Sequence, residues 1–321
     1  MKKKVVLTKN YLEEVIERLK REFELVVVED TGINLHEVLE ENQDAEALIS
    51  FLSDKISKES IDICKNLKII ANYAVGYNNI DYKHAIEKGI YVTNTPDILT
   101  PATADLTMAL ILSVSRRIVE ADEFVRRGKF KGWEAKLMLG KELNGSTIGI
   151  IGMGRIGLAL ALRAKAFGMN VIYYSRTRKQ EIERVYDFKF VRFIELIRES
   201  DVVSVHIPYS KDVYHLFNKD VFGLMKKDAI FINVSRGALM DEECLAQVLE
   251  KNELFGAGLD VYEFEPDVTE KLKKLKNLVL TPHIGSATYK TRLAMAMMTY
   301  NDVVLALSGK KPSYLIPECK L

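Results

Sequence analysis

The sequence predicts an α/β protein of two domains, each a doubly wound parallel β-sheet flanked by helices. Short apolar runs alternate with helical patterns along almost the whole chain, which is typical of strands joined by helical crossovers. The alternation falls into two blocks of unequal length, one over the first hundred residues and one that begins near Ser146. The length of 321 residues agrees with two domains, at about 150 residues each.

The first block contains five apolar runs separated by four segments with apolar residues at helical spacing. Gly89 matches a helix stop just before the last of these runs. We expect strands at 4–7, 24–28, 47–50, 68–72 and 91–93, and helices at 10–21, 34–40, 58–65 and 82–88.

The two prolines at 96 and 101 then interrupt regular structure. Thr100 can cap a helix and Pro101 suits its first position, so we expect a long helix to begin here. It should run to about residue 127, where two arginines and Gly128 provide a C-terminal signal.

The second block repeats the strand–helix alternation from residue 147 onward. We expect strands at 147–152, 170–175, 202–207, 229–233, 257–261 and 278–281. We expect helices at 155–167, 193–198, 219–225 and 241–251, with a last helix at 288–307.

Composition limits the classes of partner. With 46 Lys and Arg against 45 Asp and Glu, the net charge of +1 gives no global attraction to nucleic acid or to an anionic membrane, so we expect neither as a partner. No run approaches the ~20 apolar residues of a membrane span, and the N-terminus lacks the apolar core of a signal peptide. Three distant cysteines (Cys64, Cys244 and Cys319) form neither a disulfide framework nor a metal motif, which favours the cytoplasm and no metal.

A glycine-rich turn joins the first strand and helix of the second block. Gly152, Gly154 and Gly157 form G-x-G-x-x-G in the strand–turn–helix context of a Rossmann-like dinucleotide site. The first glycine permits the turn, the second lets a pyrophosphate approach, and the third lets helix and strand pack closely. Arg155 and Ile156 open the helix, whose free N–H groups attract phosphate, so both join the cofactor-binding candidates. The alternative is a turn that binds nothing.

The end of the next strand bears on the choice of cofactor. NAD is usually held there by an acidic residue, but this chain has Ser175, followed by Arg176, Thr177 and Arg178. A hydroxyl and a guanidinium suit a 2′-phosphate, so we expect NADP(H) to be preferred, with NAD(H) possible. The alternative is that Arg176 stacks on adenine and both cofactors bind.

Three polar side chains follow three later strands: Arg236, Glu265 and His283. The carboxyl ends of parallel strands are where ligands sit, so the three form a candidate catalytic set. Taken singly, each has a plainer explanation: a surface salt bridge for the arginine, a loop for the glutamate and a buried turn for the histidine.

With these residues, the chain resembles the D-2-hydroxyacid dehydrogenases, and among them most closely the glyoxylate/hydroxypyruvate reductases. Phrases of that group are NYAVGYNNID at 72–81, VTNTP at 92–96, ATAD at 102–105 and YSRTR at 174–178. The resemblance covers nearly the whole chain, with the motifs in the family's order. It implies that a dinucleotide-binding domain, 100–285, is inserted in a substrate domain formed by 1–99 and 286–321.

The resemblance implies NAD(P)H-dependent reduction of glyoxylate or hydroxypyruvate to the D-2-hydroxy acid. His283 would be the general acid, as histidine suits proton transfer near neutral pH. Glu265 would orient His283 and favour the imidazolium, and Arg236 would bind the substrate carboxylate. Backbone N–H groups near Val75 and Gly76 would hold the same carboxylate.

Further cofactor contacts follow from the same resemblance. The alternative for Asp260 is a polar strand end, and His206 is better explained as structural than as catalytic. These positions are Thr103, His206, Pro208, Val234, Asp260 and Gly285. The helix after Pro101 and the segment around Trp133 would form a homodimer face. Alternatives are a D-3-phosphoglycerate or D-lactate type dehydrogenase of the same family, or a dinucleotide-sensing, corepressor-like binding protein.

Overall fold

The computed structural model describes residues 2–28 and 35–320. The chain divides into two compact units, each with its own sheet. We call them the split unit (Met1–Leu99 with Ser286–Leu321) and the inserted unit (Thr100–Gly285). Residue Asn34, where we expected the second helix to begin, lies outside the described residues.

The split unit contains a five-stranded parallel sheet in the order β2-β1-β3-β4-β5. Its strands are β1 (Lys4–Leu7), β2 (Glu24–Val27), β3 (Ala47–Ser50), β4 (Ile69–Asn72) and β5 (Tyr91–Thr93). Its helices are α1 (Glu13–Glu22), α2 (Leu35–Glu41), α3 (Lys58–Ile63), α4 (Tyr82–Glu87), α13 (Tyr289–Leu307) and the 3₁₀ helix η3 (Pro317–Lys320).

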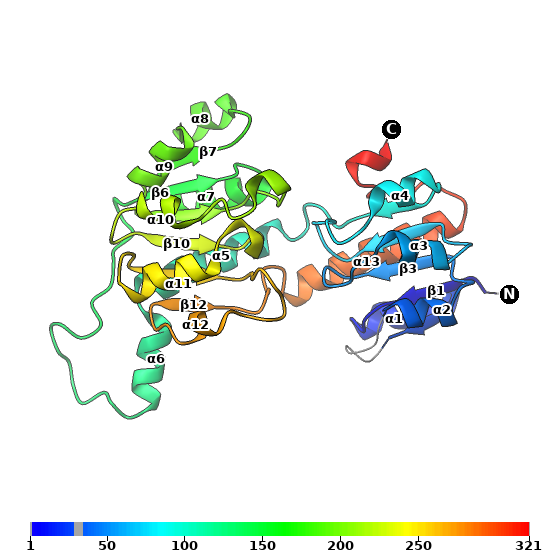
Figure 1. The fold of residues 1–321 in the computed structure, drawn as a ribbon, viewed down its shortest axis with the longest axis horizontal. Helices are drawn as coiled ribbons and strands as arrows, with labels where there is room; N and C mark the ends of the chain where they lie inside the picture. Colours follow the sequence, from blue (N-terminus) through cyan, green and yellow to red (C-terminus); the bar gives the residue numbers. More distant parts are fainter. Residues whose placement is uncertain (1, 29–34, 321) are drawn as a thin grey trace. The chain divides into compact units, whose positions relative to one another are not determined.

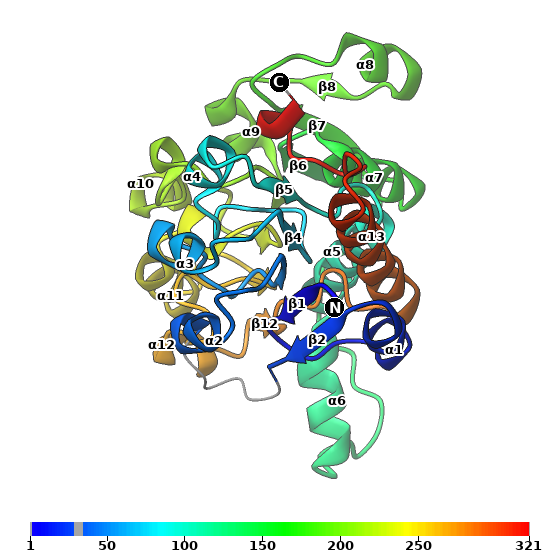
Figure 2. The same cartoon turned by 90° about the vertical axis from the view of Figure 1, so that its right-hand side faces the viewer.

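Both faces of this sheet are buried, so its strands are continuously apolar rather than alternating. Successive side chains point to opposite faces: Val5 and Leu7 pack with residues of α1 and α13, whereas Val6 packs with residues of α2 and α3. Figure 2 shows α1 and α13 on one side of the strands and α2, α3 and α4 on the other.

The inserted unit contains a seven-stranded parallel sheet in the order β12-β11-β10-β9-β6-β7-β8 (Figure 1). Its strands are β6 (Thr147–Ile151), β7 (Asn170–Tyr174), β8 (Lys189–Phe190), β9 (Val202–Val205), β10 (Ile230–Asn233), β11 (Gly256–Leu259) and β12 (Leu278–Leu280). The chain leaves β6 toward β7 on one side and returns to β9 on the other. The order therefore reverses at β6, and the carboxyl ends of β6 and β9 flank the place where open α/β sheets bind ligands.

Helices cover both faces of this sheet as well. Val171 and Tyr173 pack in a core with α5 and α7, and Ile172 packs in a second core with α9, α10 and α11. The helical elements of the unit are α5 (Thr100–Ser115), α6 (Ile118–Arg126), α7 (Arg155–Ala166), α8 (Gln180–Tyr186), α9 (Phe193–Glu199), η1 (Lys211–Val213), α10 (Lys219–Gly223), η2 (Gly237–Leu239), α11 (Glu242–Glu250) and α12 (Glu270–Lys273). The predicted α/β fold with two parallel sheets is confirmed.

The single long helix expected from 100 to about 127 is wrong. The chain forms α5 and α6, and between them Arg117 adopts a left-handed conformation with φ 52°. The break is stabilised from a distance, because the Lys141 N–H donates to the Ser115 carbonyl at 2.7 Å. A side chain at Gly140 would collide with that same carbonyl. None of the helices described is long and apolar enough to span a bilayer.

Candidate active site

The glycine-rich turn links β6 to α7 with geometry that suits a pyrophosphate. Gly152 has φ 101°, and a Cβ there would lie 2.7 Å from the His206 carbonyl oxygen. A Cβ on Gly157 would strike the Gly152 carbonyl oxygen, so helix and strand pack in direct contact. A Cβ on Gly154 would meet nothing within 4 Å, and Gly154 caps α7 without a side-chain hydrogen bond. The turn thus has open space over the N–H groups that begin α7, at Arg155 and Ile156, as an anion requires.

The segment after β7 separates the two arginines expected near a phosphate. Arg178 donates to Glu183 on α8, with Nε at 3.0 Å and Nη2 at 2.7 Å, and its guanidinium lies over the Phe190 ring. Arg176 is exposed and has no partner among the residues described. Ser175 donates its hydroxyl to the Thr177 carbonyl at 2.6 Å. The structure therefore leaves Arg176, and not Arg178, as the basic group available here.

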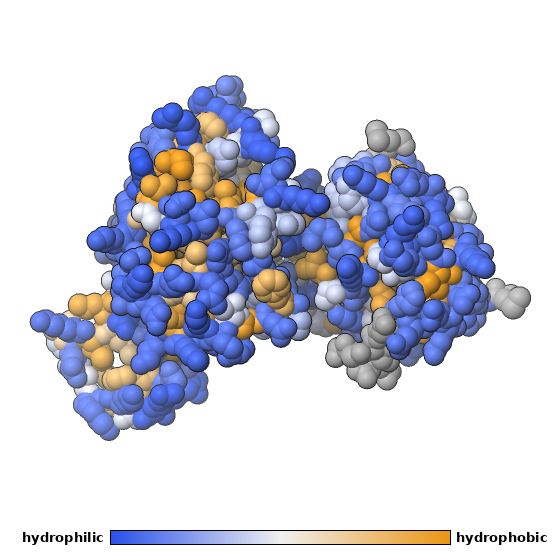
Figure 3. All heavy atoms as spheres, in the orientation of Figure 1, coloured by the Kyte–Doolittle hydropathy of each residue, from blue (hydrophilic) through white to orange (hydrophobic). Residues whose placement is uncertain are grey.

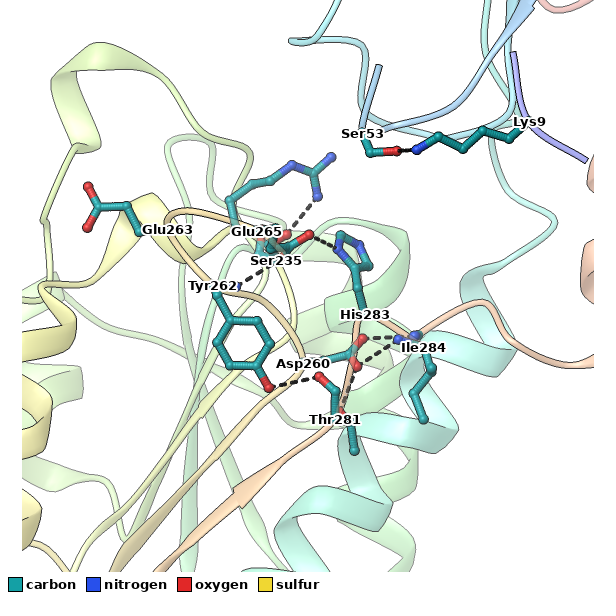
Figure 4. A network of polar contacts seen from close by, with 12 residues as sticks. Lys9, Ser53, Ser235, Asp260, Tyr262, Glu263, Glu265, Thr281, His283 and Ile284 are labelled. Carbon is teal, nitrogen blue, oxygen red and sulfur yellow. Dashed lines mark hydrogen bonds and ion pairs between the residues drawn. The ribbon is translucent and has the colours of Figure 1, made fainter. Parts of the chain in front are cut away.

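Arg236, Glu265 and His283 follow the neighbouring strands β10, β11 and β12. The Glu265 carboxylate lies 2.8 Å from Nδ1 of His283, and its other oxygen accepts the Tyr262 N–H at 3.0 Å. Figure 4 shows Glu265 reaching the His283 ring from the loop after β11. About a third of each side chain is exposed, 34% for Glu265 and 32% for His283, so the pair is reachable by a small molecule.

The groups around this pair keep the Glu265 carboxylate ionised. Burial raises the pKa of Glu265, but His283, the Tyr262 N–H and Arg236 outweigh burial and hold that pKa below its ordinary value. Burial lowers the pKa of Arg236, and Glu265 opposes that shift. An ionised carboxylate only accepts hydrogen bonds, so Nδ1 of His283 carries the hydrogen and Nε2 is the nitrogen that can exchange a proton.

Asp260 supports the segment that carries His283. One oxygen accepts the Thr281 hydroxyl at 2.6 Å and the Ile284 N–H at 2.8 Å, and the other accepts the Gly285 N–H at 2.8 Å (Figure 4). Burial raises the pKa of Asp260, although these donors oppose the shift. Thr103 on α5 donates to the Gly285 carbonyl at 3.2 Å. Asp260 thus holds the Thr281 side chain before His283 and the backbone after it. His283 itself has a left-handed φ of 53°, which few residues other than glycine adopt.

The remaining cofactor candidates lie at the same edge of the sheet. His206 and Pro208 follow β9, and Val234 follows β10. Nε2 of His206 is 2.8 Å from the Ser204 hydroxyl, and burial lowers the pKa of His206 to about 3. His206 is therefore neutral at physiological pH.

Val75 and Gly76 belong to the split unit, in the loop after β4. Their carbonyls accept hydrogen bonds from Asn94 and Asn72 at 2.7 and 2.8 Å. Among the residues described, the N–H groups of Val75 and Gly76 have no acceptor. Two adjacent N–H groups of this kind are suited to binding an anion.

Comparison with known proteins identifies the family. Residues 108–285 match the model of the D-isomer specific 2-hydroxyacid dehydrogenase NAD-binding domain. The chain belongs to this family. Glyoxylate reductase of Thermococcus litoralis is 47% identical, over 98% of this chain and 97% of that protein, and the Pyrococcus horikoshii glyoxylate reductase is 46% identical over 98% and 96%. The NADPH-dependent glyoxylate/hydroxypyruvate reductase of Sinorhizobium meliloti, solved with NADP and malonate, has a TM-score of 0.90 at 31% identity, covering 99% of this chain and 98% of that one.

The chain is accordingly an NAD(P)-dependent 2-hydroxyacid dehydrogenase. Four further residues hold its site together and belong to none of the predicted sets: Ser204, Tyr262, Thr281 and Ile284. The first lies within a strand, and two of the others act through backbone N–H groups, which no sequence motif reveals. Thr281 stands two residues before His283, and its position at a strand end was the one available signal.

Because His206 of this dehydrogenase is neutral in the folded state, we expect the folded state to lose stability as the pH falls below 6.5. The pKa is about 3 folded against 6.5 unfolded, so below pH 6.5 the unfolded chain binds the extra proton and the folded chain does not. The contribution of neutral His206 to the free energy of unfolding is therefore complete above pH 6.5. It falls by at most about 1.4 kcal/mol per pH unit as the pH is lowered toward 3. Urea unfolding at pH 7 and pH 5 should show a smaller loss of stability for His206→Asn than for the wild type. The control is His36→Asn on the exposed side of α2, and an equal loss in wild type and His206→Asn would contradict the prediction.

Proposed function

We propose that this chain reduces a small 2-oxo acid, glyoxylate or hydroxypyruvate, to the D-2-hydroxy acid with NAD(P)H. The observation that carries the proposal is the Glu265–His283 pair beside Arg236, at the carboxyl edge of the sheet that also carries the glycine-rich turn. The names of the relatives support this substrate class.

In this proposal the nicotinamide supplies the hydride when the cofactor is bound. His283 donates the proton from Nε2 to the carbonyl oxygen as that oxygen gains negative charge, and it takes the proton back in the oxidation direction. Glu265 holds the ring by Nδ1 and stabilises its charged form. Arg236 binds the substrate carboxylate through its planar fork and polarises the 2-oxo group, and the N–H groups of Val75 and Gly76 bind the same carboxylate.

A steady-state screen of glyoxylate, hydroxypyruvate, pyruvate and phosphohydroxypyruvate with both cofactors tests the substrate. We expect the highest kcat/KM with glyoxylate or hydroxypyruvate. A clear preference for phosphohydroxypyruvate or pyruvate would instead support a D-3-phosphoglycerate or D-lactate type dehydrogenase. Cofactor binding without turnover of any of the four would support the corepressor-like alternative.

We propose NADP(H) as the preferred cofactor and expect Ser175→Asp with Arg176→Ala to reverse the preference. The new carboxylate would accept from a 2′-hydroxyl and repel a 2′-phosphate, and the double variant also lacks the guanidinium. The kcat/KM ratio of NADPH over NADH should fall at least about tenfold, the loss expected for about 1.5 kcal/mol of charge-assisted bonding. Arg178→Ala is the matched control, because Glu183 already holds that guanidinium. An unchanged ratio in the double variant, or an equal fall in the control, would contradict the assignment.

We propose a homodimer that covers the arm formed by α6 and the segment through Leu139. The arm leaves large apolar side chains exposed in the single chain, including Trp133 at 86%, Leu139 at 63% and Phe130 at 55%, and α6 has no buried residue. Figure 3 shows hydrophobic surface on this arm next to hydrophilic surface. Sedimentation equilibrium should give twice the chain mass for the wild type and a monomer for Phe130→Asp with Trp133→Asp. A monomeric wild type would contradict the dimer.

We place the protein in the cytoplasm. The three cysteines are free thiols, and burial raises the pKa of Cys64 to about 11, which keeps that thiol protonated and unreactive. Free thiols suit a reducing compartment.

A further inference from the structure

Glu263, two residues before Glu265, has an enclosed carboxylate that takes no part in the reaction proposed above. Only 9% of its side chain is exposed. One oxygen accepts the Tyr214 hydroxyl at 2.8 Å, and the other lies 2.9 Å from Nε2 of His215. The Tyr214 and His215 rings stack with centroids 3.9 Å apart. In Figure 4 Glu263 points away from Glu265, so the same loop holds one carboxylate at the site and anchors another on its far side.

Tyr214 and His215, which hold Glu263, belong to a second loop that is hydrogen-bonded to the loop of Arg236. His215 and Phe217 donate their N–H groups to the carbonyls of Ala238 and Leu239 at 3.0 and 2.9 Å. The Asp241 N–H donates back to the Phe217 carbonyl at 3.0 Å. Three backbone hydrogen bonds therefore make the segment 214–217 and the segment 236–241 one rigid support.

The Glu265 loop packs directly on this support. A Cβ on Gly237 would lie 1.9 Å from the Tyr262 carbonyl carbon, so the two backbones touch with no room for a side chain. Buried Glu242 accepts the Glu263 N–H at 2.7 Å and also the Thr269 hydroxyl. The Glu263 residue is thus held by its N–H and by both carboxylate oxygens. The preceding N–H, that of Tyr262, is the one that Glu265 accepts.

We propose that Glu263 is a positioning residue for the reaction: with Tyr214, His215 and Glu242 it fixes the loop that holds Glu265 against His283. This inference rests on the proposed function of Glu265 and His283. Enclosed carboxylates with charge-assisted hydrogen bonds hold a loop more firmly than neutral contacts do. The Glu265 carboxylate must stay within hydrogen-bond distance of Nδ1, and small displacements of such groups are costly to rate.

Glu263→Ala tests the role through a pH profile. We expect kcat/KM for the 2-oxo acid to fall about tenfold, less than the ~10²-fold that a 1 Å misplacement can cost. Reduction needs protonated His283, and a looser Glu265 stabilises the imidazolium less. The alkaline limb of the profile should therefore move to lower pH by about 0.5 to 1 unit. The charged groups that act on the pair, Asp260 and Arg236, are unchanged in this variant.

Two milder variants guard against a simple folding defect. Glu263→Gln keeps an acceptor for the Tyr214 hydroxyl and should retain most of the activity. Tyr214→Phe removes one donor and fills the same space, so its alkaline limb should move in the same direction by a smaller amount. An alkaline limb in Glu263→Ala that lies at the wild-type pH would overturn the proposal.

Asp201→Ala is the matched control. Asp201 also holds a backbone N–H, that of Thr147 at 2.8 Å, and an ion pair to Lys226 at 2.8 Å, but at the amino end of the same sheet. We expect it to lower the melting temperature without moving the alkaline limb, and an equal movement would overturn the positioning role. Loss of turnover in His283→Ala with no shift in Glu263→Ala would overturn the role of Glu263 alone. Undiminished turnover in His283→Ala would overturn the proposed function itself.

Discussion

Replacing His283 by alanine is expected to lower kcat for 2-oxo acid reduction by about 10²- to 10⁴-fold, the usual contribution of a positioned general acid. The 2-oxo carbon cannot accept a hydride efficiently unless the developing oxyanion is protonated. Nε2 of His283 is the group placed for that transfer, because Nδ1 already donates to Glu265 at 2.8 Å. Steady-state kinetics with NADPH and glyoxylate measures the loss.

Cofactor binding should be nearly unchanged in His283→Ala, since the glycine-rich turn lies on a different strand end. A fluorescence titration with NADPH provides this check. His84→Ala is the control, because His84 is a helical histidine of the split unit that pairs with Asp62. A kcat for His283→Ala within about threefold of the wild type, far below the usual effect of a general acid, would contradict the assignment.

Arg236→Lys should have the second-largest effect, a loss of about 10- to 150-fold in kcat/KM. That range corresponds to about 1.5–3 kcal/mol for a hydrogen bond to a charged group. Lysine keeps the charge but presents a single point, whereas the guanidinium fork can engage a carboxylate with two parallel hydrogen bonds. The Arg236 backbone is held independently, because the Asn233 side chain donates to its carbonyl at 2.9 Å.

The matching control for Arg236→Lys is Arg163→Lys on α7, where the arginine pairs with Asp105 at 2.7 Å outside the site. We expect wild-type kinetics from the control. In Arg236→Lys the loss in kcat/KM should come mainly from a higher KM for the 2-oxo acid. The KM for NADPH should stay unaltered. Equal kinetics for both arginine variants would contradict a role for Arg236 in binding the carboxylate.

The strands, and the carboxyl edge of the sheet as the place of the site, could be predicted because local sequence signals determine them. Parallel strands buried on both faces are continuous apolar runs, and β3 and β9 match their predicted starts. The glycines of the turn were recognisable because backbone geometry requires them: Gly152 has a positive φ, and Gly157 touches backbone. The polar residues after β10, β11 and β12 stood out because the strands before them are apolar.

What the sequence did not reveal depends on distant contacts. The break between α5 and α6 is stabilised by Gly140 and Lys141, which contact Ser115 although they lie 25 and 26 residues later in the chain. Arg178 was expected to face a phosphate, but its partner Glu183 lies on α8, a helix with no buried residue and therefore a weak apolar pattern. The network of Glu263 could not be predicted for the same reason, because its partners lie far from it in the chain: Tyr214 and His215 follow η1, and Glu242 begins α11.

The measurement that tests the central claim most directly follows the hydride into the product and compares the wild type with His283→Ala. The purified chain is incubated with glyoxylate and NADPH that carries deuterium at the transferable position of the nicotinamide, and the glycolate formed is analysed by mass spectrometry. The account predicts glycolate with one deuterium from the wild type, and a rate of labelling in His283→Ala that is lower by about 10²-fold or more. Bound cofactor with no labelled glycolate, or equal labelling rates in the two proteins, would contradict it.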